Sequence, residues 1–186
     1  MRDGIVNRSA RLARQLCLIA VAYFVALNPT TPVVAETGAV PAPFAPFRFL
    51  LGRWVANGDQ TGATGGFAFA FDLQNHVIAR TNYSNTPSAG ERPASRHDDL
   101  LVIYLEGDAV KADYFDSEGH VIRYVVSATP QTIVFLSDVI SGQPRYRLTY
   151  RRGASDDTLT GTFEIAPPAK PDGFAPYLSW SARKSK

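Results

Sequence analysis

Phe49-Leu50-Leu51-Gly52-Arg53-Trp54-Val55 (FLLGRWV) marks the start of the part of the chain that we expect to fold. It follows residues 36–47, where proline alternates with small residues, and it precedes the first runs of alternating apolar and polar residues. An indole buries on the order of 200 Å², enough to seal one end of a barrel. We therefore expect this stretch to open a closed antiparallel barrel, with Trp54 in a structural role.

From this stretch onward the sequence predicts strands and no helix. Runs with period-2 alternation, or rich in β-branched and aromatic residues, recur about every ten residues between Gly, Pro, Asn and Asp. Ten such strands need a second sheet or closure, and closure leaves no exposed edge. We expect an all-β fold, a single antiparallel meander closed into a barrel of about ten strands. The predicted strands are 49–57, 66–73, 76–83, 99–106, 109–116, 120–127, 131–137, 144–151, 158–165 and 175–183.

One turn assigns the faces of two strands. Residues 116–119 (DSEG) have Asp first and Gly fourth, as in a type I hairpin turn with a bulge. This register pairs Tyr114 with Ile122 on the inner face and Asp113 with Arg123 on the outer face. Asp113 and Arg123 are then a surface ion pair. With reversed parity they would be a buried pair able to hold a carboxylate or shift a proton.

A second turn supports the same inner face. Gly107 and Asp108 form a two-residue hairpin that puts Ile103 on the face of Tyr114. Since a slip of one residue would send the apolar set to solvent, the agreement between two turns favours this register. Arg145 and Arg147 alternate with inward tyrosines, and the polar strand opposite favours an outward position for both. With reversed parity they would face inward, where Arg and Tyr could hold a carboxylate. The side chains that we expect to line the interior are Phe67, Phe69, Phe71, Ile103, Tyr114, Tyr124, Tyr146, Tyr150 and Phe163.

Residues 1–35 have the layout of a secretory signal peptide. Four arginines precede an apolar run over residues 16–27, and Val33-Val34-Ala35 offers small residues for cleavage after Ala35. An uncleaved anchor is the alternative, but the run is shorter than the roughly 20 residues that span a bilayer. Cys17 lies inside the run without a lipobox, so no lipid anchor is expected. The sequence predicts a periplasmic or secreted protein with a proline-rich arm (36–47) and one domain (48–184).

The charge of the chain comes largely from its first 35 residues. They hold four of the 19 basic and one of the 17 acidic residues, which leaves 15 basic and 16 acidic residues afterwards. This balance argues against a nucleic-acid or anionic-membrane partner. The single cysteine lies in the leader, so a hydrophobic core must hold the domain without disulfides.

Gly52-Arg53-Trp54 resembles the Gly-x-Trp signature on the first strand of the calycins, the superfamily of lipocalins and fatty-acid-binding proteins. The resemblance covers about residues 48–184. Residues 112–124 (ADYFDSEGHVIRY) and 163–172 (FEIAPPAKPD) are similar to uncharacterised exported bacterial proteins with a lipocalin-like domain. The resemblance implies that Trp54 plugs one barrel end, with a basic residue of the last strand, Arg183, packed across it.

The sequence contains no motif for a catalytic site. It has no Gly-x-Ser-x-Gly, no glycine-rich phosphate loop and no cysteine after the leader. His76, His97 and His120 match no metal-ligand spacing, so no metal site is predicted. By parity, His97 and Asp99 face inward, near the barrel entrance. Some calycins bind haem through a late histidine, but no histidine follows residue 120, so no cofactor is expected.

These observations favour a binding protein that holds a small apolar or amphipathic ligand. Inward aromatic side chains supply apolar contacts and hydroxyl groups, and ten strands favour an interior cavity over a filled one. The first alternative is an isomerase or cyclase that uses interior Tyr with Asp or His. The second is a structural envelope protein without a ligand. The sequence does not determine the oligomeric state.

Residues 84–98 form the longest break between the predicted strands. They are rich in Pro, Ser, Gly and Ala and lead into His97 and Asp99. Loops of this length are often lids, with a mobile surface excursion as the alternative. We expect the loop to cover the barrel mouth, where Arg92 or Arg96 could meet a polar head group.

Overall fold

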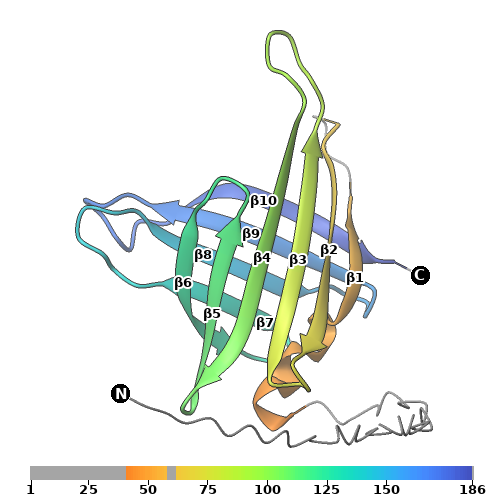
Figure 1. Ribbon diagram of the computed structural model, residues 1–186, viewed down its shortest axis with the longest axis vertical. Helices are drawn as coiled ribbons and strands as arrows, with labels where there is room; N and C mark the ends of the chain where they lie inside the picture. The colour runs from red at the N-terminus through yellow and green to blue at the C-terminus, as the bar shows by residue number, and fades with distance from the viewer. Residues whose placement is uncertain (1–40, 58–61, 186) are drawn as a thin grey trace, which may run out of the picture. The chain divides into compact units, whose positions relative to one another are not determined.

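The computed structural model describes residues 41–57 and 62–185, which belong to one compact unit and form a closed β-barrel (Figure 1). Ten antiparallel strands follow each other around the barrel in chain order, and β1 closes the ring by pairing with β10. The predicted fold class is confirmed. The strands are β1 (Gly52–Ala56), β2 (Thr64–Asp72), β3 (Val77–Thr86), β4 (Ser95–Glu106), β5 (Ala109–Asp116), β6 (Val121–Ala128), β7 (Thr132–Ser137), β8 (Arg145–Arg152), β9 (Thr158–Ala166) and β10 (Ala175–Lys184).

The two turns that assigned the faces have the predicted registers. Tyr114 pairs with Ile122 and Asp113 pairs with Arg123 across β5 and β6. The backbone N–H of Gly119 donates to the carbonyl of Asp116 at 3.0 Å, which closes the turn between these strands. The inner face of this half of the barrel therefore follows from the turn residues alone.

The break predicted at residues 84–98 is shorter in the structure. β3 continues to Thr86 and β4 begins at Ser95, which leaves residues 87–94 as the connection, with a single bridge between Ala89 and Arg92. Here the two strands extend away from the rest of the barrel as a hairpin (Figure 1). Because this extension has little core to cover, its residues are polar on both faces and lack the alternation that marks a strand.

The proline-rich arm also ends earlier than predicted. A 3₁₀-helix, η1 (Ala42–Leu50), precedes β1 and buries Phe44, Phe47 and Leu50. A 3₁₀-helix has three residues per turn, so apolar residues spaced by three lie on one face. Residues 42–47, which were predicted as part of an arm before the domain, therefore belong to a 3₁₀-helix that packs against the core. Residues 36–40 and the leader, 1–35, lie outside the described residues.

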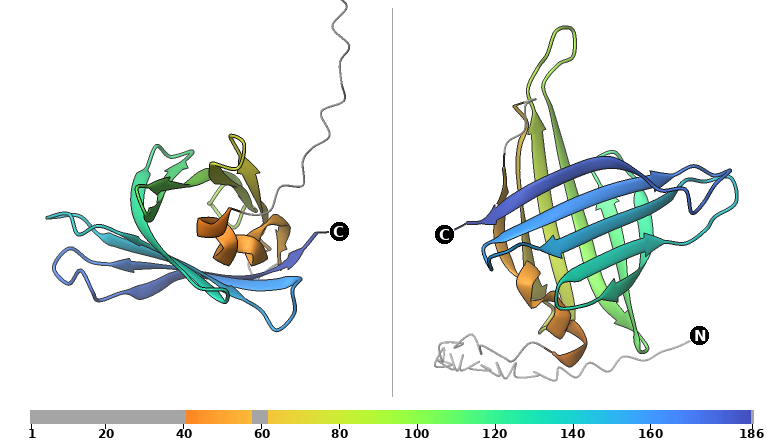
Figure 2. Two further views of the ribbon diagram at one scale, coloured as in Figure 1. Left: turned by 90° about the horizontal axis from the view of Figure 1, so that it is seen from below. Right: turned by 180° about the vertical axis from the view of Figure 1, so that it is seen from behind.

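The barrel has two ends of different construction. η1 lies within the ring of strands at one end, beside the β2–β3 turn (Figure 2). We call this the η1 end. The opposite end carries the β3–β4, β5–β6, β7–β8 and β9–β10 connections, because antiparallel connections alternate between ends. We call it the far end.

The middle of the barrel is filled by side chains. The buried core combines the three η1 side chains with Trp54, Phe67, Phe69, Phe135 and Tyr150. The sequence favoured an interior cavity. In the structure η1 adds two phenylalanines and a leucine to the aromatic residues of the strands, and these side chains occupy the middle of the barrel.

No helix within residues 41–57 and 62–185 is long and apolar enough to cross a membrane.

Candidate functional site

Tyr150 on β8 lies at the centre of the aromatic core. Its ring meets Phe67, Phe69, Phe135 and Trp180, with centroids 5.4 to 6.3 Å apart and mostly edge to face. Such geometry matches the negative face of one ring to the positive edge of another. The Tyr150 side chain is fully buried, so its hydroxyl group needs a partner inside the protein.

That partner is Arg80 on β3, which is 4 % exposed. Nη1 of Arg80 donates to the Tyr150 hydroxyl oxygen at 2.5 Å, and Nη2 donates to the carboxylate of Asp99 on β4. Asn82 donates to the other Asp99 oxygen at 2.7 Å. Register explains the grouping, because Arg80 pairs with Phe69 and Asn82 pairs with Asp99 on the inner face. We call Arg80, Asn82, Asp99 and Tyr150 the arginine cluster.

The electrostatics of the arginine cluster keep Arg80 charged and Tyr150 neutral. Burial alone would lower the pKa of Arg80, but Tyr150 and the Asp99 carboxylate raise it well above its usual range. Burial raises the pKa of Tyr150, although Arg80 opposes this effect. Nε of Arg80 is buried and has no hydrogen-bond partner among the described residues. A buried donor of this kind is expensive unless an acceptor reaches it.

Next to the arginine cluster, His97 lies between several polar groups. Its Nε2 is 3.2 Å from the Tyr114 hydroxyl oxygen and 3.4 Å from Oδ2 of Asp99, and its Nδ1 is 2.7 Å from Oε2 of Glu118. Burial raises the pKa of Tyr114 well above its usual range, and the carboxylates of Asp99 and Asp116 add to the effect. His97, Asp116 and Glu118 could also hold a metal ion, a grouping that the sequence spacings did not predict.

Four inward aromatic residues are only half-buried: Tyr114, Tyr146 and Phe163 toward the far end, and Trp180 in the middle of β10. The rings of Tyr146 and Phe163 stack with centroids 5.9 Å apart and an interplanar angle of 7°. On β10 a register shift between Pro176 and Leu178 leaves Leu178 more than half exposed opposite Phe163. Apolar surface is therefore left accessible to solvent at this end.

No protein-family model matches the chain, and no curated protein matches it. The closed ten-stranded antiparallel barrel is compatible with the calycin-like fold that the Gly-x-Trp resemblance implies. The site must therefore be interpreted from its own residues.

The structure places the nine predicted lining residues on the inner face, either within the core or packed against it. Their role in ligand binding stays a prediction. His97 and Asp99 also face inward, as parity indicated. Arg183 pairs with Val55, whereas Lys184 lies opposite Trp54 with Nζ 5.4 Å from the indole centroid. The cation over Trp54 is thus one residue further along β10 than the sequence suggested.

The charged residues whose orientation the sequence left open lie on the outer face: Asp113, Arg123, Arg145 and Arg147. Arg147 makes a two-pronged ion pair with Glu164 at 2.6 and 2.7 Å, and its guanidinium carbon is 4.2 Å from the centroid of the Phe174 ring. Asp113 accepts a hydrogen bond from the Tyr104 hydroxyl group at 3.3 Å and lines an outer-face groove of about 320 Å³ with Arg123. The two residues are opposite each other, but the predicted ion pair between them is not among those of the described residues. Neither Asp113 nor Arg147 contributes to the interior.

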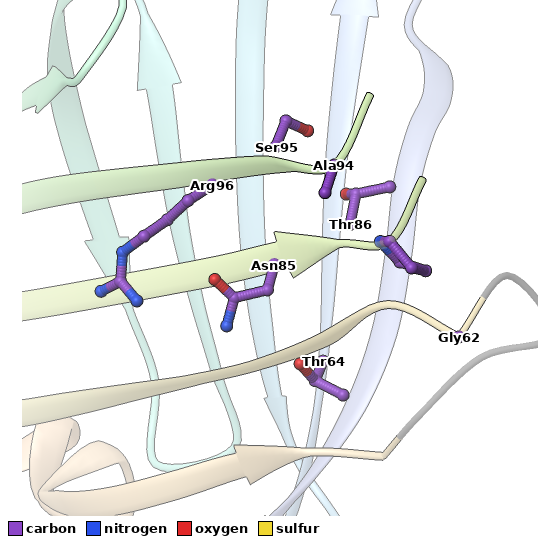
Figure 3. A pocket seen from close by; sticks show the side chains of 8 residues that line it. Gly62, Thr64, Asn85, Thr86, Ala94, Ser95 and Arg96 are labelled. Carbon is purple, nitrogen blue, oxygen red and sulfur yellow. The ribbon is translucent and has the colours of Figure 1, made fainter. Parts of the chain in front are cut away.

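A second groove, of about 400 Å³, lies where β2, β3 and β4 approach the far end (Figure 3). Small and polar side chains line it, including Thr64, Asn85, Ser95 and Arg96. The guanidinium group of Arg96 is held by Asp98 at 2.6 Å and lies 5.0 Å from the centroid of the Tyr83 ring. Of the two arginines predicted to meet a head group, Arg96 is therefore already paired.

Sequence reasoning missed the arginine cluster as a unit. Alternate residues of a strand share a face, so Arg80 lies on the same face as Ile78. In β2 the partner of Arg80 is the inward Phe69, which places Arg80 inside the barrel. The β2–β3 turn gave no clear signal, since its Leu73, Gln74 and Asn75 adopt positive φ without a glycine. Only the pairing of β2 with β3 reveals Arg80 as an interior residue.

Proposed function

We propose that the protein binds a small amphipathic molecule at the far end of the barrel. One observation carries this proposal: half-buried aromatic side chains lie next to a buried polar cluster on the same inner face. Tyr150 links the two, because its hydroxyl group contacts Arg80 while its ring contacts the half-buried Trp180. Ligand sites commonly combine apolar walls with a few oriented polar groups.

The arrangement also favours one chemistry for the ligand. Tyr146, Phe163 and Trp180 offer ring faces and edges for a flat apolar body. Because Asp99 neutralises Arg80, the arginine cluster has little net charge to attract an ion. Asn82, His97 and Tyr114 offer hydrogen bonds instead. The polar end of the ligand is therefore a neutral group, such as a hydroxyl, carbonyl or amide.

A neutral fluorescent probe tests the location of the site. N-phenyl-1-naphthylamine, which brightens in apolar surroundings, is titrated into the wild-type protein and two variants. Phe163→Ala removes a half-buried inward ring, and Phe115→Ala removes a ring that is 40 % exposed on the outer face. We expect the first variant to bind the probe at least tenfold more weakly and the second to match the wild type. Equal affinities in all three proteins would reject the far end as the site.

A second candidate function is acid–base catalysis at the same end. His97 has a tyrosine hydroxyl and a carboxylate oxygen within 3.4 Å of Nε2, so two polar groups converge on a group able to transfer protons. If an isomerase or cyclase uses His97, His97→Gln should retain an unconverted substrate during purification. Mass spectrometry then finds different bound molecules in the variant and in the wild type. The same bound molecule in both would argue for binding without turnover.

We also propose that the protein is exported, on the basis of its first 35 residues. The four arginines, the apolar run and the small residues before Ala35 support cleavage by a signal peptidase. Amino-terminal sequencing of protein recovered from its own cell should begin at Glu36. Recovery of the intact amino terminus would contradict cleavage.

A further inference from the structure

The β5–β6 turn brings two carboxylates to a histidine of the β4 extension. One ligand atom from each of His97, Asp116 and Glu118 lies within 4.8 Å of the others. The turn is fastened to β4, because the N–H of Ser117 donates to the carbonyl of Asp98 at 2.9 Å. Three potential metal ligands thus come from one strand extension and one adjacent turn.

Both ring nitrogens of His97 face polar groups, and Nδ1 faces the carboxylate of Glu118. Nδ1 is 2.7 Å from Oε2 of Glu118, and Nε2 is 3.2 Å from the Tyr114 hydroxyl oxygen and 3.4 Å from Oδ2 of Asp99. A neutral imidazole has one N–H and can donate to only one of these carboxylates. When Nε2 carries the hydrogen, the lone pair of Nδ1 points toward the Glu118 carboxylate. In this tautomer Nδ1 and the Glu118 carboxylate can bind the same metal ion.

Neighbouring groups orient the potential ligands His97 and Asp116, as the groups around a metal site usually orient its ligands. Asp99 faces Nε2 of His97 and is itself fixed by Arg80 and Asn82, like the outer carboxylate that orients many metal-binding histidines. Oδ1 of Asp116 accepts hydrogen bonds from two backbone N–H groups, of Glu118 and of His120. Two of the three ligands are therefore already oriented.

The local charge also favours a cation. Within the described part of the chain, the ion pairs of Asp116 and Glu118 are with histidines, which carry a full charge only when protonated. Glu118 is half exposed on its turn, so it can move the short distance needed to close around an ion. One imidazole nitrogen with two carboxylates suits borderline ions such as Zn²⁺ better than Ca²⁺, which prefers oxygen alone.

We propose that His97, Asp116 and Glu118 bind a divalent transition-metal ion of the Zn²⁺ type. His97 is shared with the proposed small-molecule site, but the test does not depend on that proposal, because the metal alone is the probe. Isothermal titration of the chelator-treated full chain with Zn²⁺ should show one ion per chain, and Ca²⁺ should bind much more weakly. His97→Gln and Glu118→Gln should each weaken Zn²⁺ binding at least tenfold.

Matched variants distinguish the site from adventitious binding. His76→Gln and Glu91→Gln remove an exposed histidine and an exposed glutamate elsewhere on the barrel, and both should bind Zn²⁺ like the wild type. Circular dichroism confirms that each variant is folded. The proposal is overturned if no saturable Zn²⁺ binding occurs, or if His97→Gln or Glu118→Gln keeps wild-type affinity. Zn²⁺ binding that is lost in His76→Gln would equally place the ion elsewhere.

Discussion

Gly52 and Trp54 have separate tasks at the start of β1. Gly52 has φ of 114°, a conformation that other residues adopt only with strain, and it turns the chain from η1 into the strand. Nε1 of Trp54 donates to the carbonyl of Leu50 at 2.7 Å, and its ring lies nearly parallel to Phe67. The Gly-x-Trp stretch therefore joins the helix that closes the η1 end to the first strand.

Replacing Trp54 tests its structural role. Trp54→Ala should lower the free energy of unfolding by about 3–5 kcal/mol, because a buried ring and a satisfied N–H are lost. Trp54→Phe should lose less, since it keeps part of the ring packing. Urea unfolding measures both, with Phe115→Ala on the outer face as a control. An unchanged unfolding midpoint for Trp54→Ala would refute the plug assignment.

The ion pair between Arg80 and Asp99 makes a second prediction at the residue scale. Both side chains are 5 % exposed, so removing one charge leaves the other buried without compensation. Asp99→Asn should therefore destabilise the fold by about 3–5 kcal/mol. The neighbouring Asp98 is half exposed and pairs with Arg96, so Asp98→Asn should cost less than about 1 kcal/mol. Equal losses for the two variants would show that burial does not govern this pair.

At the scale of elements, the β3–β4 connection should contribute little to stability. All residues from 87 to 94 are exposed, and the bridge between Ala89 and Arg92 is the one pairing described within them. Replacing 87–94 by a short Gly-Ser link should leave the melting temperature nearly unchanged. If the connection covers the mouth, retention of the naphthylamine probe should weaken. Unchanged retention would exclude it as the portal, whereas a large drop in melting temperature would show an unrecognised structural role.

The ion pair between Arg147 on β8 and Glu164 on β9 predicts that the stability of the fold depends on pH. The hydrogen bonds from Arg147 hold the pKa of the Glu164 carboxyl group below its usual value. A carboxyl group with a lowered folded pKa stabilises the fold above its unfolded pKa, and this contribution is lost as pH falls through the folded pKa. Glu164→Gln should thus lower the free energy of unfolding by up to about 1 kcal/mol at pH 7 and by almost nothing at pH 2. A difference that stays constant between these pH values would contradict the assignment.

The two halves of the barrel differ in how well the sequence predicts them. In β4–β6, Gly107-Asp108 and Asp116–Gly119 are turns with known residue preferences, so register and inner face followed directly. In η1, Phe44, Phe47 and Leu50 are spaced by three, a short pattern that fits a 3₁₀-helix but is not specific to one. The turn residues predict more than the apolar spacing does. A turn of known type fixes the register of two strands, whereas three apolar residues at a short spacing do not specify one structure.

At the scale of the whole molecule, the order of the strands predicted a closed barrel, and the alternation of apolar and polar residues predicted its apolar inner face. Neither pattern predicted the candidate site. Arg80, Asn82 and Asp99 come from two strands, and Tyr150 comes from β8 across the barrel. Their meeting depends on barrel closure and on the stagger between strands, which no local pattern encodes. A buried charge inside an otherwise apolar face is also an exception to the alternation that predicts strands.

The central claim is that the far end of the barrel holds a small amphipathic molecule with a neutral polar group. Native mass spectrometry of the protein, purified from its own compartment, tests it most directly, with Phe163→Ala prepared in parallel. We predict a discrete added mass on the wild-type protein that is released on unfolding and is depleted in Phe163→Ala. A wild-type protein that carries no added mass, or one whose added mass is unaffected by Phe163→Ala, would contradict the claim.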